Sequence, residues 1–333
     1  MFERFINQYR KTFWCCVLLT ALSVPLRASA DSNSPVLINF FVDDDKDSVV
    51  RAMGNRFKEL VAKQIGAKVQ VNIHGLGDRD LFEEMRVGNT QMIAPKLSRL
   101  KRYSRRLQVF ELPFIFYSEK AARNFLDGEW GKRLLISLKN KGVNAHGYIH
   151  QGMKHLTSDV EILTPNDASG KAMGIFYSNT SKQYFENIGS EIVSLNDTEE
   201  NSALSNNRVN ITENNWGRVY NQKLYGQHEY VLESNHTYTG NVLITSKDIW
   251  EEMPAQLVPV LEKIIKESIE YGNDYARKRN ERYRQAVVNT GSNTVHELAA
   301  RDRYLWIEAA SYIWSLYEDE IGSQLIDAAA SHR

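Results

Sequence analysis

Histidine and carboxylate side chains are the groups in this chain that could hold a metal ion or carry acid and base chemistry. His146, His150 and His155 form the one histidine cluster along the sequence, with spacings of four and five residues. Spread over a predicted strand and the loop after it, three such nitrogens do not surround one metal ion, so we expect no metal site. Glu199 and Glu213 could form an acid and base pair, but sequence alone gives no distance between them. We therefore favour a structural role for these carboxylates, at helix ends or in polar networks.

Motifs that mark the common enzyme classes do not occur in residues 31–333. This part of the sequence contains no glycine-rich phosphate loop, no nucleophile elbow and no His-Glu-x-x-His zinc helix. The two cysteines, Cys15 and Cys16, lie in an N-terminal segment that we expect to be removed, so the mature chain would have neither a thiol nucleophile nor a disulfide. We predict that the protein is not an enzyme and uses no cofactor.

The first 30 residues have the layout of a cleavable secretory signal. Arg4, Arg10 and Lys11 precede an apolar stretch at 13–26, and small residues at 28–30 provide a cleavage site. A stop-transfer helix is the alternative, but the apolar stretch is shorter than the roughly 20 residues that a membrane span needs. We predict cleavage after Ala30 and a periplasmic location.

Charge and length narrow the remaining classes of protein. Removal of residues 1–30 takes away four basic residues and one acid, which leaves 37 basic and 40 acidic residues. This balance argues against a nucleic-acid partner, because a nucleic-acid-binding protein needs a clustered basic face. A mature chain of about 300 residues is too long for one ordinary core and suits two lobes.

Hydrophobic periodicity predicts alternating strands and helices. Residues 36–42 form a buried apolar run, and apolar positions from Val49 to Val61 repeat at helical spacing before Gly66 ends the helix. The same reasoning predicts strands at 69–73, 91–94, 143–149 and 192–195, and helices at 79–87, 118–140, 178–188 and 198–204. Such alternation is typical of α/β layers.

Two long helices are predicted toward the C-terminus. One begins near Pro254 and extends to about residue 288, and the other covers about 294–329. The apolar residues predicted to share one face of the last helix are Leu298, Leu305, Ala309, Tyr312, Ile313 and Leu316. We expect this face to pack into the core, with a coiled-coil partner as the weaker alternative.

Short motifs in a fixed order give the chain a family resemblance. They include Glu-Leu-Pro-Phe-Ile-Phe at 111–116, Gln-Gly-Met-Lys at 151–154, Glu-Asn at 213–214 and Asn-His-x-Tyr at 235–238. Each motif is weak alone. The ordered set resembles the solute-binding subunits of tripartite ATP-independent periplasmic (TRAP) transporters over nearly all of the mature chain.

The resemblance implies an α/β fold of the two-lobed periplasmic binding protein type, with long C-terminal helices and a hinge that closes the lobes on a ligand. Lobe I would hold residues 31–151 and 240–279, and lobe II residues 152–239 and 280–333. The implied partners are a small-molecule ligand and either membrane permease subunits or a membrane sensor protein.

Family members usually bind an organic acid, and a signature arginine holds its carboxylate through two parallel hydrogen bonds. The matching position here is Gly174, and no arginine occurs between residues 170 and 193. A second family arginine corresponds to Lys154, which keeps the charge but not the planar fork. Asp197 stands where the family has an aromatic residue. The resemblance therefore implies a cleft without the usual clamp, which would suit an organic acid held differently or a polar or cationic ligand.

The predicted ligand-binding residues are Asp78, Lys154, Gly174, Asp197, Asn214 and His236. Asn214 is the first candidate together with Lys154, because an amide can both donate and accept hydrogen bonds in a cleft. His236 and Tyr238 could equally be hydrogen-bonded core groups. Gly174 is included as the mark of the missing arginine.

Two functions agree with these features. One is a receptor that captures a small polar solute, an organic acid or a changed ligand class, for a TRAP-type transporter. The other is a periplasmic receptor that feeds a membrane signalling protein. Both use a soluble two-lobed receptor, and the missing motifs disfavour a periplasmic hydrolase. We predict the transport role.

Overall fold

The computed structural model describes residues 35–176, 178–196 and 199–332. Val36–Arg333 form one compact unit, and the predicted signal segment lies outside the described residues. Within those described ranges, no helix combines the length and the apolar character needed to cross a membrane.

Nine strands of the described residues form one mixed sheet in the order β2-β1-β3-β8-β4-β7-β5-β6, with β9 beside β8. The strands are β1 (Val36–Val42), β2 (Val69–Gly75), β3 (Met92–Ile93), β4 (Val143–Ser158), β5 (Ala172–Phe176), β6 (Glu191–Leu195), β7 (Ile211–Asn214), β8 (Tyr230–Ser246) and β9 (Thr294–Glu297). Strands β1, β2 and β3 pair in parallel at one end of the sheet, and β5, β6 and β7 do so at the other. The parallel pairs with helical connections agree with the predicted α/β alternation.

The helices follow the predicted pattern most closely near the N-terminus. Helix α1 (Val49–Gln64) buries all six apolar positions predicted for it, and Gly66 after it has a φ of 71°. The other helices are α2 (Leu81–Arg86), α3 (Glu119–Asp127), α4 (Glu129–Leu138), α5 (Asn179–Asn187), α6 (Glu200–Ser205), α7 (Trp216–Asn221), α8 (Lys247–Glu252), α9 (Val258–Thr290), α10 (Ala300–Leu316), α11 (Glu318–Ile321) and α12 (Ser323–Ser331).

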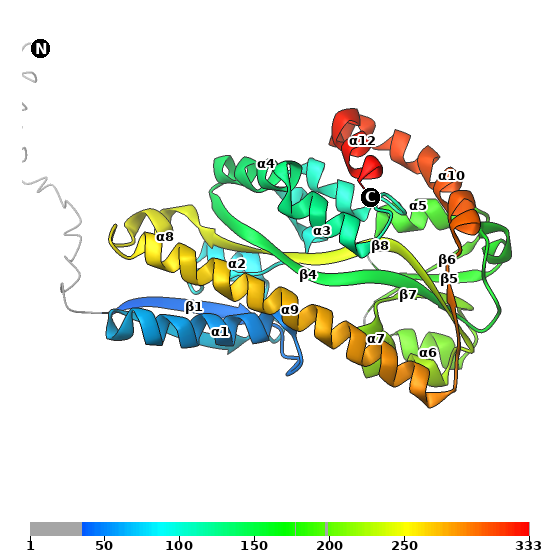
Figure 1. The fold of residues 1–333 in the computed structure, drawn as a ribbon, viewed down its shortest axis with the longest axis horizontal. Helices are drawn as coiled ribbons and strands as arrows, with labels where there is room; N and C mark the ends of the chain where they lie inside the picture. The colour runs from blue at the N-terminus through cyan, green and yellow to red at the C-terminus, as the bar shows by residue number, and fades with distance from the viewer. Residues whose placement is uncertain (1–34, 177, 197–198, 333) are drawn as a thin grey trace, which may run out of the picture. The chain divides into compact units, whose positions relative to one another are not determined.

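Two long strands connect the ends of the sheet. The sequence pattern predicts only the first part of β4 and none of β8, yet the two strands pair from Val143–Ser246 to Ser158–Tyr230. Each is antiparallel to the strands on both of its sides along this path, β8 to β3 and β4 to β7. Figure 1 shows β4 and β8 running side by side through the centre of the fold.

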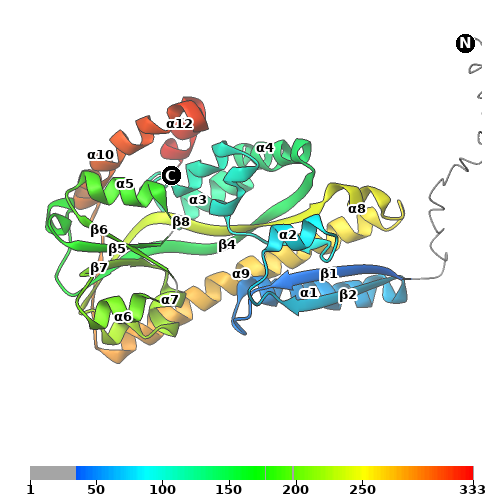
Figure 2. The same cartoon turned by 180° about the vertical axis from the view of Figure 1, so that it is seen from behind.

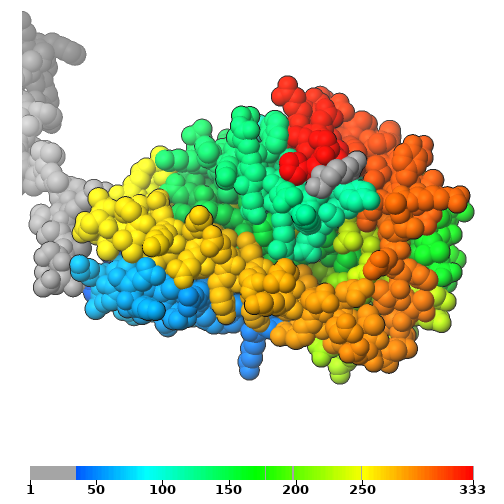
Figure 3. All heavy atoms as spheres, viewed as in Figure 1, coloured from blue at the N-terminus to red at the C-terminus, as the bar shows by residue number. Residues whose placement is uncertain are grey.

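Helix α9 also reaches both ends of the sheet. Its first half packs Leu261, Ile264 and Ile265 into a core with β1, β2 and α1, and its second half packs Tyr283 and Val287 into a core with α6 and α7. Its 33 residues span about 50 Å. Figure 3 shows α9 crossing this face of the molecule. Seen from behind, α5 and α7 lie on opposite faces of β5, β6 and β7 (Figure 2).

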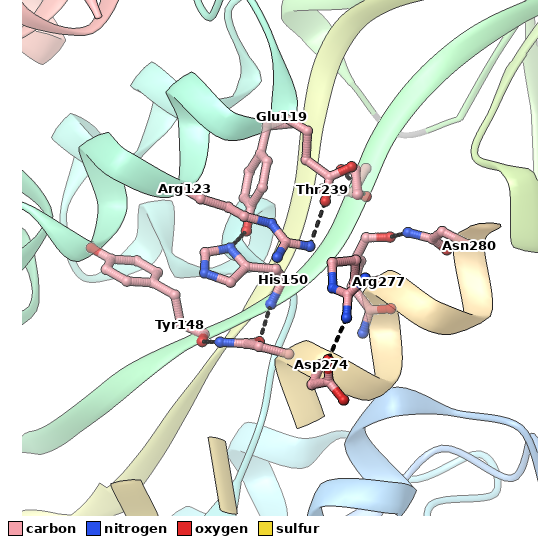
Figure 4. A network of polar contacts seen from close by, with 12 residues as sticks. Glu119, Arg123, Tyr148, His150, Thr239, Asp274, Arg277 and Asn280 are labelled. Carbon is pink, nitrogen blue, oxygen red and sulfur yellow. Dashed lines mark hydrogen bonds and ion pairs between the residues drawn. The ribbon is translucent and has the colours of Figure 1, made fainter. Parts of the chain in front are cut away.

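The strands β4 and β8 and the helix α9 meet where β4 bulges. The β4–β8 register shifts between His150 and Gly152, and Gly152 has a φ of 107°. Asn280 of α9 donates to the Gln151 carbonyl at 2.8 Å, and Thr239 of β8 donates to the Gly152 carbonyl at 2.9 Å. Figure 4 shows this network, with Asn280 beside β4. The lobe boundaries expected at 151/152, 239/240 and 279/280 thus fall close together in space.

The structure corrects two of the predicted helices. The helix expected at 118–140 is two helices, α3 and α4, because the backbone at Gly128 is extended, with φ −79° and ψ −169°. The helix expected at 294–329 begins with a strand, since Thr294–Glu297 pair with β8. Gly322, with a φ of 95°, then separates α11 from α12.

The predicted apolar face of the last helix is confirmed only in part, because Ile313 is buried and Leu298 and Ala309 pack against the core. Leu305, Tyr312 and Leu316 are exposed, and the buried face of α10 carries Trp306, Ala310 and Ile313. The two faces have the same spacing and differ by about one residue, so periodicity alone did not distinguish them. Contacts of Trp306 help to set the orientation of the helix, since its ring stacks on Phe114 and its indole N–H donates to the Leu163 carbonyl at 2.9 Å.

Substitution of Gly152 by alanine should destabilise the fold through both backbone and packing. A Cβ at this position would lie 2.5 Å from Asn280 Nδ2, in a left-handed conformation. We expect Gly152→Ala to lower the free energy of unfolding by about 2 to 3 kcal/mol. Gly170→Ala is the control, because its φ is 68° with nothing within 4 Å, and it should lose about 1 kcal/mol. Equal losses in urea unfolding would show that the contact with α9 carries no weight.

Candidate ligand-binding cleft

A cleft of about 680 Å³ lies over the central strands β4 and β8. Its walls come from the loop between β1 and α1, the 3-10 helix η3 (Arg105–Glu111), the ends of β5 and β7, helix α7 and the middle of α9. The charged residues that line it are Asp43, Asp45, Asp47, Lys96, Glu111, Lys154, Glu213, Arg218 and Arg279. The acidic and basic residues are nearly equal in number, so the net charge of the cleft favours neither an anionic nor a cationic ligand.

Lys154 and Glu213 form a buried ion pair at the base of the cleft. The Lys154 Nζ lies 2.5 Å from Glu213 Oε1, and the Glu213 side chain is fully buried. On the other side, the His236 Nε2 lies 3.1 Å from Glu213 Oε2, and the His236 Nδ1 lies 2.7 Å from Ser234 Oγ. Each Glu213 oxygen therefore has a partner, one on β4 and one on β8.

Partners, rather than solvent, keep Glu213 ionised. Burial alone would raise the pKa of this carboxyl, but the charge of Lys154 and the hydrogen bond with His236 outweigh burial and lower the pKa to about 2. Burial lowers the pKa of His236, against the opposing effect of Glu213. His236 itself is not among the residues lining the cleft, so it supports Glu213 from behind.

Asn214 lines the cleft, as predicted, but its amide nitrogen is already bonded. The Nδ2 donates to Glu200 at 2.9 Å and to the Thr212 hydroxyl at 2.8 Å, whereas the buried Oδ1 has no hydrogen-bond partner in the described residues. Glu200 also binds the Arg218 Nε at 2.6 Å. The Arg218 guanidinium lies over the Phe176 ring, 4.6 Å from its centroid.

The position of the missing arginine is closed by apolar side chains. A Cβ on Gly174 would lie 2.7 Å from Leu195 Cδ1, 3.1 Å from Thr212 Cγ2 and 3.4 Å from Val209 Cγ1. Gly174 is not among the residues lining the cleft. The space that an arginine side chain at position 174 would need is therefore occupied by the side chains of neighbouring core residues.

Two other predicted site residues are not brought to the cleft. Asp78 is exposed in the turn before α2 and does not line the cleft, because the turn at residues 77–80 projects into solvent. Asp197 lies outside the described residues. Of the six predicted residues, the structure thus places Lys154 and Asn214 at the cleft, with His236 one contact behind them.

Arg279 is a cleft residue that the sequence reasoning missed. Its Nη1 donates to the Asp47 carbonyl at 2.9 Å, and its Nη2 to Gln151 Oε1 at 3.2 Å. Burial lowers its pKa. A signal was present, since Arg279 continues the buried face of α9 between Ala276 and Tyr283. An arginine on a buried helical face is a candidate for a polar site.

Glu111, at the end of η3, is a second cleft residue without a predicted role. It is 9 % exposed, and its Oε1 has no hydrogen-bond partner among the described residues. Burial raises its pKa to about 7, despite the opposing charges of Lys101 and Lys154. This carboxyl therefore lacks the direct partners that Glu213 has.

The three histidines of the sequence cluster have separate environments. His146 Nε2 lies 2.9 Å from Thr245 Oγ1, and His150 Nδ1 bonds to the Tyr238 hydroxyl. His155 packs against Trp216, and burial lowers its pKa to about 4. Among the described residues, no group of three or more His, Cys, Asp or Glu is arranged to hold a metal ion.

Replacing Lys154 should expose the cost of an unpaired Glu213. We expect Lys154→Met to lower the free energy of unfolding by about 3 kcal/mol at pH 7, because a buried carboxylate loses its cation. Since the folded pKa of Glu213 is below its ordinary value, its contribution is present above about pH 4.5 and fades toward pH 2. The loss should therefore shrink in acid.

The control for this measurement is Lys182→Met, which removes an exposed ion pair with Glu186 at 3.8 Å. We expect it to cost less than about 0.5 kcal/mol in urea unfolding. Adding Glu213→Gln to Lys154→Met should recover part of the stability. A double variant no more stable than Lys154→Met would contradict the assignment.

Replacing Glu111 should raise the free energy of unfolding, whereas replacing Lys154 should lower it. Its folded pKa of about 7 exceeds its ordinary value of 4.5, so ionisation destabilises the fold as pH rises from about 4.5 to 7. We expect Glu111→Gln to raise the free energy of unfolding by about 2 kcal/mol at pH 8 and to change it little at pH 4. Glu262→Gln, on an exposed position of α9, is the control. A Glu111→Gln variant less stable than the parent at pH 8 would refute this account.

Comparison with known proteins places the chain in one family. The family model for bacterial extracellular solute-binding proteins, family 7, matches residues 42–320. The C4-dicarboxylate-binding periplasmic protein of Shewanella loihica is 31% identical over 320 residues, which covers 95% of each chain. Its counterpart from Rhodobacter capsulatus is 29% identical over 324 residues, 96% of this chain and 97% of the relative.

Solved structures agree with these matches. A TRAP periplasmic solute-binding protein from Shewanella oneidensis, with bound succinate, is 30% identical, has a TM-score of 0.80 and covers 90% of this chain and 99% of that one. A TRAP protein from Pseudomonas aeruginosa, with bound L-malate, is 29% identical with a TM-score of 0.76, and covers 85% of this chain and 100% of that one. The two-lobed α/β fold and the resemblance are confirmed, and the chain belongs to family 7 of the bacterial extracellular solute-binding proteins.

Proposed function

We propose that the chain captures a small polar solute in the cleft over β4 and β8 and delivers it to the membrane subunits of a TRAP transporter. The observation that carries the proposal is the position of the cleft. It is built from both ends of the sheet and lies beside the point where β4, β8 and α9 pass from one end to the other. A solute held there contacts both ends at once, so binding favours their closure.

The three crossing segments support the proposed lobes, 31–151 with 240–279 and 152–239 with 280–333. A bulge and a left-handed glycine give β4 a local bend at Gly152, and the side chains of Thr239 and Asn280 donate hydrogen bonds to the backbone carbonyls of Gly152 and Gln151. Hinges of binding proteins use a few such residues to absorb a change in backbone angles.

Lys154 and Asn214 are the ligand contacts we propose. Both line the cleft, on the paired strands β4 and β7. The named relatives bind C4-dicarboxylates, and the solved relatives hold succinate and L-malate. This chain has Gly174 in place of the arginine that the family resemblance leads one to expect, so we propose a small polar solute without restricting it to dicarboxylates.

Two further aspects of the proposal concern location and chemistry. We propose export to the periplasm through cleavage after Ala30, because the relatives are named as periplasmic proteins and residues 1–30 have the layout of a signal. We also propose that the solute leaves the cleft unchanged, since the family consists of solute-binding proteins rather than enzymes.

Closure can be measured by fluorescence energy transfer in residues 31–333, which contain no native cysteine. One dye is placed at Lys63→Cys on α1 and the other at Lys182→Cys on α5, both exposed positions in different proposed lobes. We expect a saturable change in transfer with at least one member of a panel of dicarboxylates, sugar acids, amino acids and amines. Mass spectrometry should recover that compound unaltered.

The control pair carries the dyes at Lys63→Cys and Lys132→Cys, which lie in the same proposed lobe and should show no change. The absence of a change across the whole panel, or conversion of the bound compound into a product, would contradict the proposed function.

A further inference from the structure

The cations at the base of the cleft are already neutralised by buried carboxylates. Lys154 is 2.5 Å from Glu213, and Arg218 is 2.6 Å from Glu200, with the two glutamate side chains 0 % and 2 % exposed. A carboxylate ligand would have to compete with partners that cannot move into solvent. Because Lys154 and Arg218 are each paired with a buried glutamate, they contribute little to the binding of an anion.

Two further cations line the cleft, the exposed Lys96 and the buried Arg279, and Arg279 lies among acids. Asp43, Asp45 and Asp47 from the loop after β1 line the same wall, and Arg279 is bonded to the Asp47 carbonyl. At Gly174, where a further arginine would start, the packing of Leu195 leaves no room for a side chain. The cationic groups left for an acidic part of a ligand are Lys96 and Arg279, whose Nε has no hydrogen-bond partner among the described residues.

Several hydrogen-bonding oxygens of the cleft are also left unpaired. Three cleft residues each have a buried oxygen without a hydrogen-bond partner in the described part of the chain: Glu111 Oε1, Asn214 Oδ1 and Thr237 Oγ1. Their residues are 9 %, 1 % and 5 % exposed. Buried polar atoms are normally paired, so these oxygens indicate a ligand that supplies donors, and the unpaired Arg279 Nε of the same cleft indicates that it also supplies an acceptor.

Sheet pairing and local contacts place these residues on neighbouring segments that line the cleft. Asn214 pairs with His155 on β4, and the next β4 residue, Lys154, pairs with Thr237 on β8. Glu111 joins them because the segment after η3 is bonded to β8, with Phe114 N donating to the His236 carbonyl at 2.6 Å. The Glu111 carboxyl is also close enough to Lys154 to respond to its charge.

We propose that the solute carries an alkylammonium group and that Glu111, Asn214 and Thr237 bind it. This inference rests on the proposed function and defines the ligand class of the same cleft. An ammonium has three N–H donors and no acceptor, which suits the carboxylate, amide and hydroxyl oxygens of residues that line this cleft. It also supplies the positive charge that Glu111 lacks.

Three four-carbon probes separate the ligand classes by isothermal titration calorimetry: succinate with two carboxylates, 4-aminobutyrate with one of each group, and putrescine with two ammonium groups. We expect at least one of the two amines to bind about tenfold or more tightly than succinate. Tighter binding of 4-aminobutyrate would assign a zwitterionic solute, and tighter binding of putrescine a polyamine.

Glu111→Gln tests the residue. This variant keeps the shape and one acceptor but removes the charge, and it should weaken amine binding about tenfold or more while leaving any succinate binding unchanged. Because the variant is expected to be no less stable than the parent, lost binding would not reflect unfolding. Glu262→Gln on the exposed face of α9 is the matched control and should bind as the parent does.

The inference would be overturned if succinate bound more tightly than both amines, if neither amine bound, or if Glu111→Gln bound amines as the parent does. These results are distinguishable from failure of the proposed function. A chain that closes on succinate or another acid in the energy-transfer assay is still a solute receptor, whereas a chain that closes on nothing in the panel is not.

Discussion

A carboxylate sealed inside a protein has to be neutralised, and the central strands of this chain meet that requirement at Glu213. Lys154 from β4 and His236 from β8 each bond to one of its oxygens. Glu213 itself lies on β7, so a single buried acid ties together three adjacent strands that link the parallel ends of the sheet. The same contact engages the ammonium of Lys154, and the link that holds the strands together therefore takes a cation away from ligand binding.

Local patterns in the sequence were sufficient wherever one face of an element alone is buried. The α1 positions from Val49 to Val61 are all in the core, as their spacing predicts. The pattern was insufficient where apolar residues occur all round a helix. On α10, Leu305 and Trp306 are neighbours, and long-range contacts of Trp306, among them its stacking on Phe114, decide which of the two is buried. Strand β8 was missed because its pairing with β4 is entirely long-range.

The residues of the candidate site were likewise predictable from the sequence only in part. Family motifs locate Lys154 and Asn214, but a motif does not show how much room surrounds a residue. At Gly174, Leu195 leaves no room for a side chain because of the way β5 packs against β6 and β7. Glu111 was read as part of a landmark motif, and its significance lies in a missing partner, which only coordinates reveal. Arg279 could have been found by following the buried face of α9 past its apolar half.

The groups that stabilise the fold and the groups proposed to select the ligand are different ones, although both line the cleft. Glu213 has two partners and holds strands together, whereas Glu111, Asn214 and Thr237 each keep an oxygen unpaired, at a cost of about 1 to 3 kcal/mol for a buried polar group. Unpaired atoms also occur elsewhere, for example at His228, but these three oxygens belong to residues that line one cleft, together with the unpaired Nε of Arg279. A ligand that satisfies them offsets their cost only while it is bound. Selectivity can therefore change by exchange of such residues, while the Glu213 contacts, and with them the family fold, stay the same.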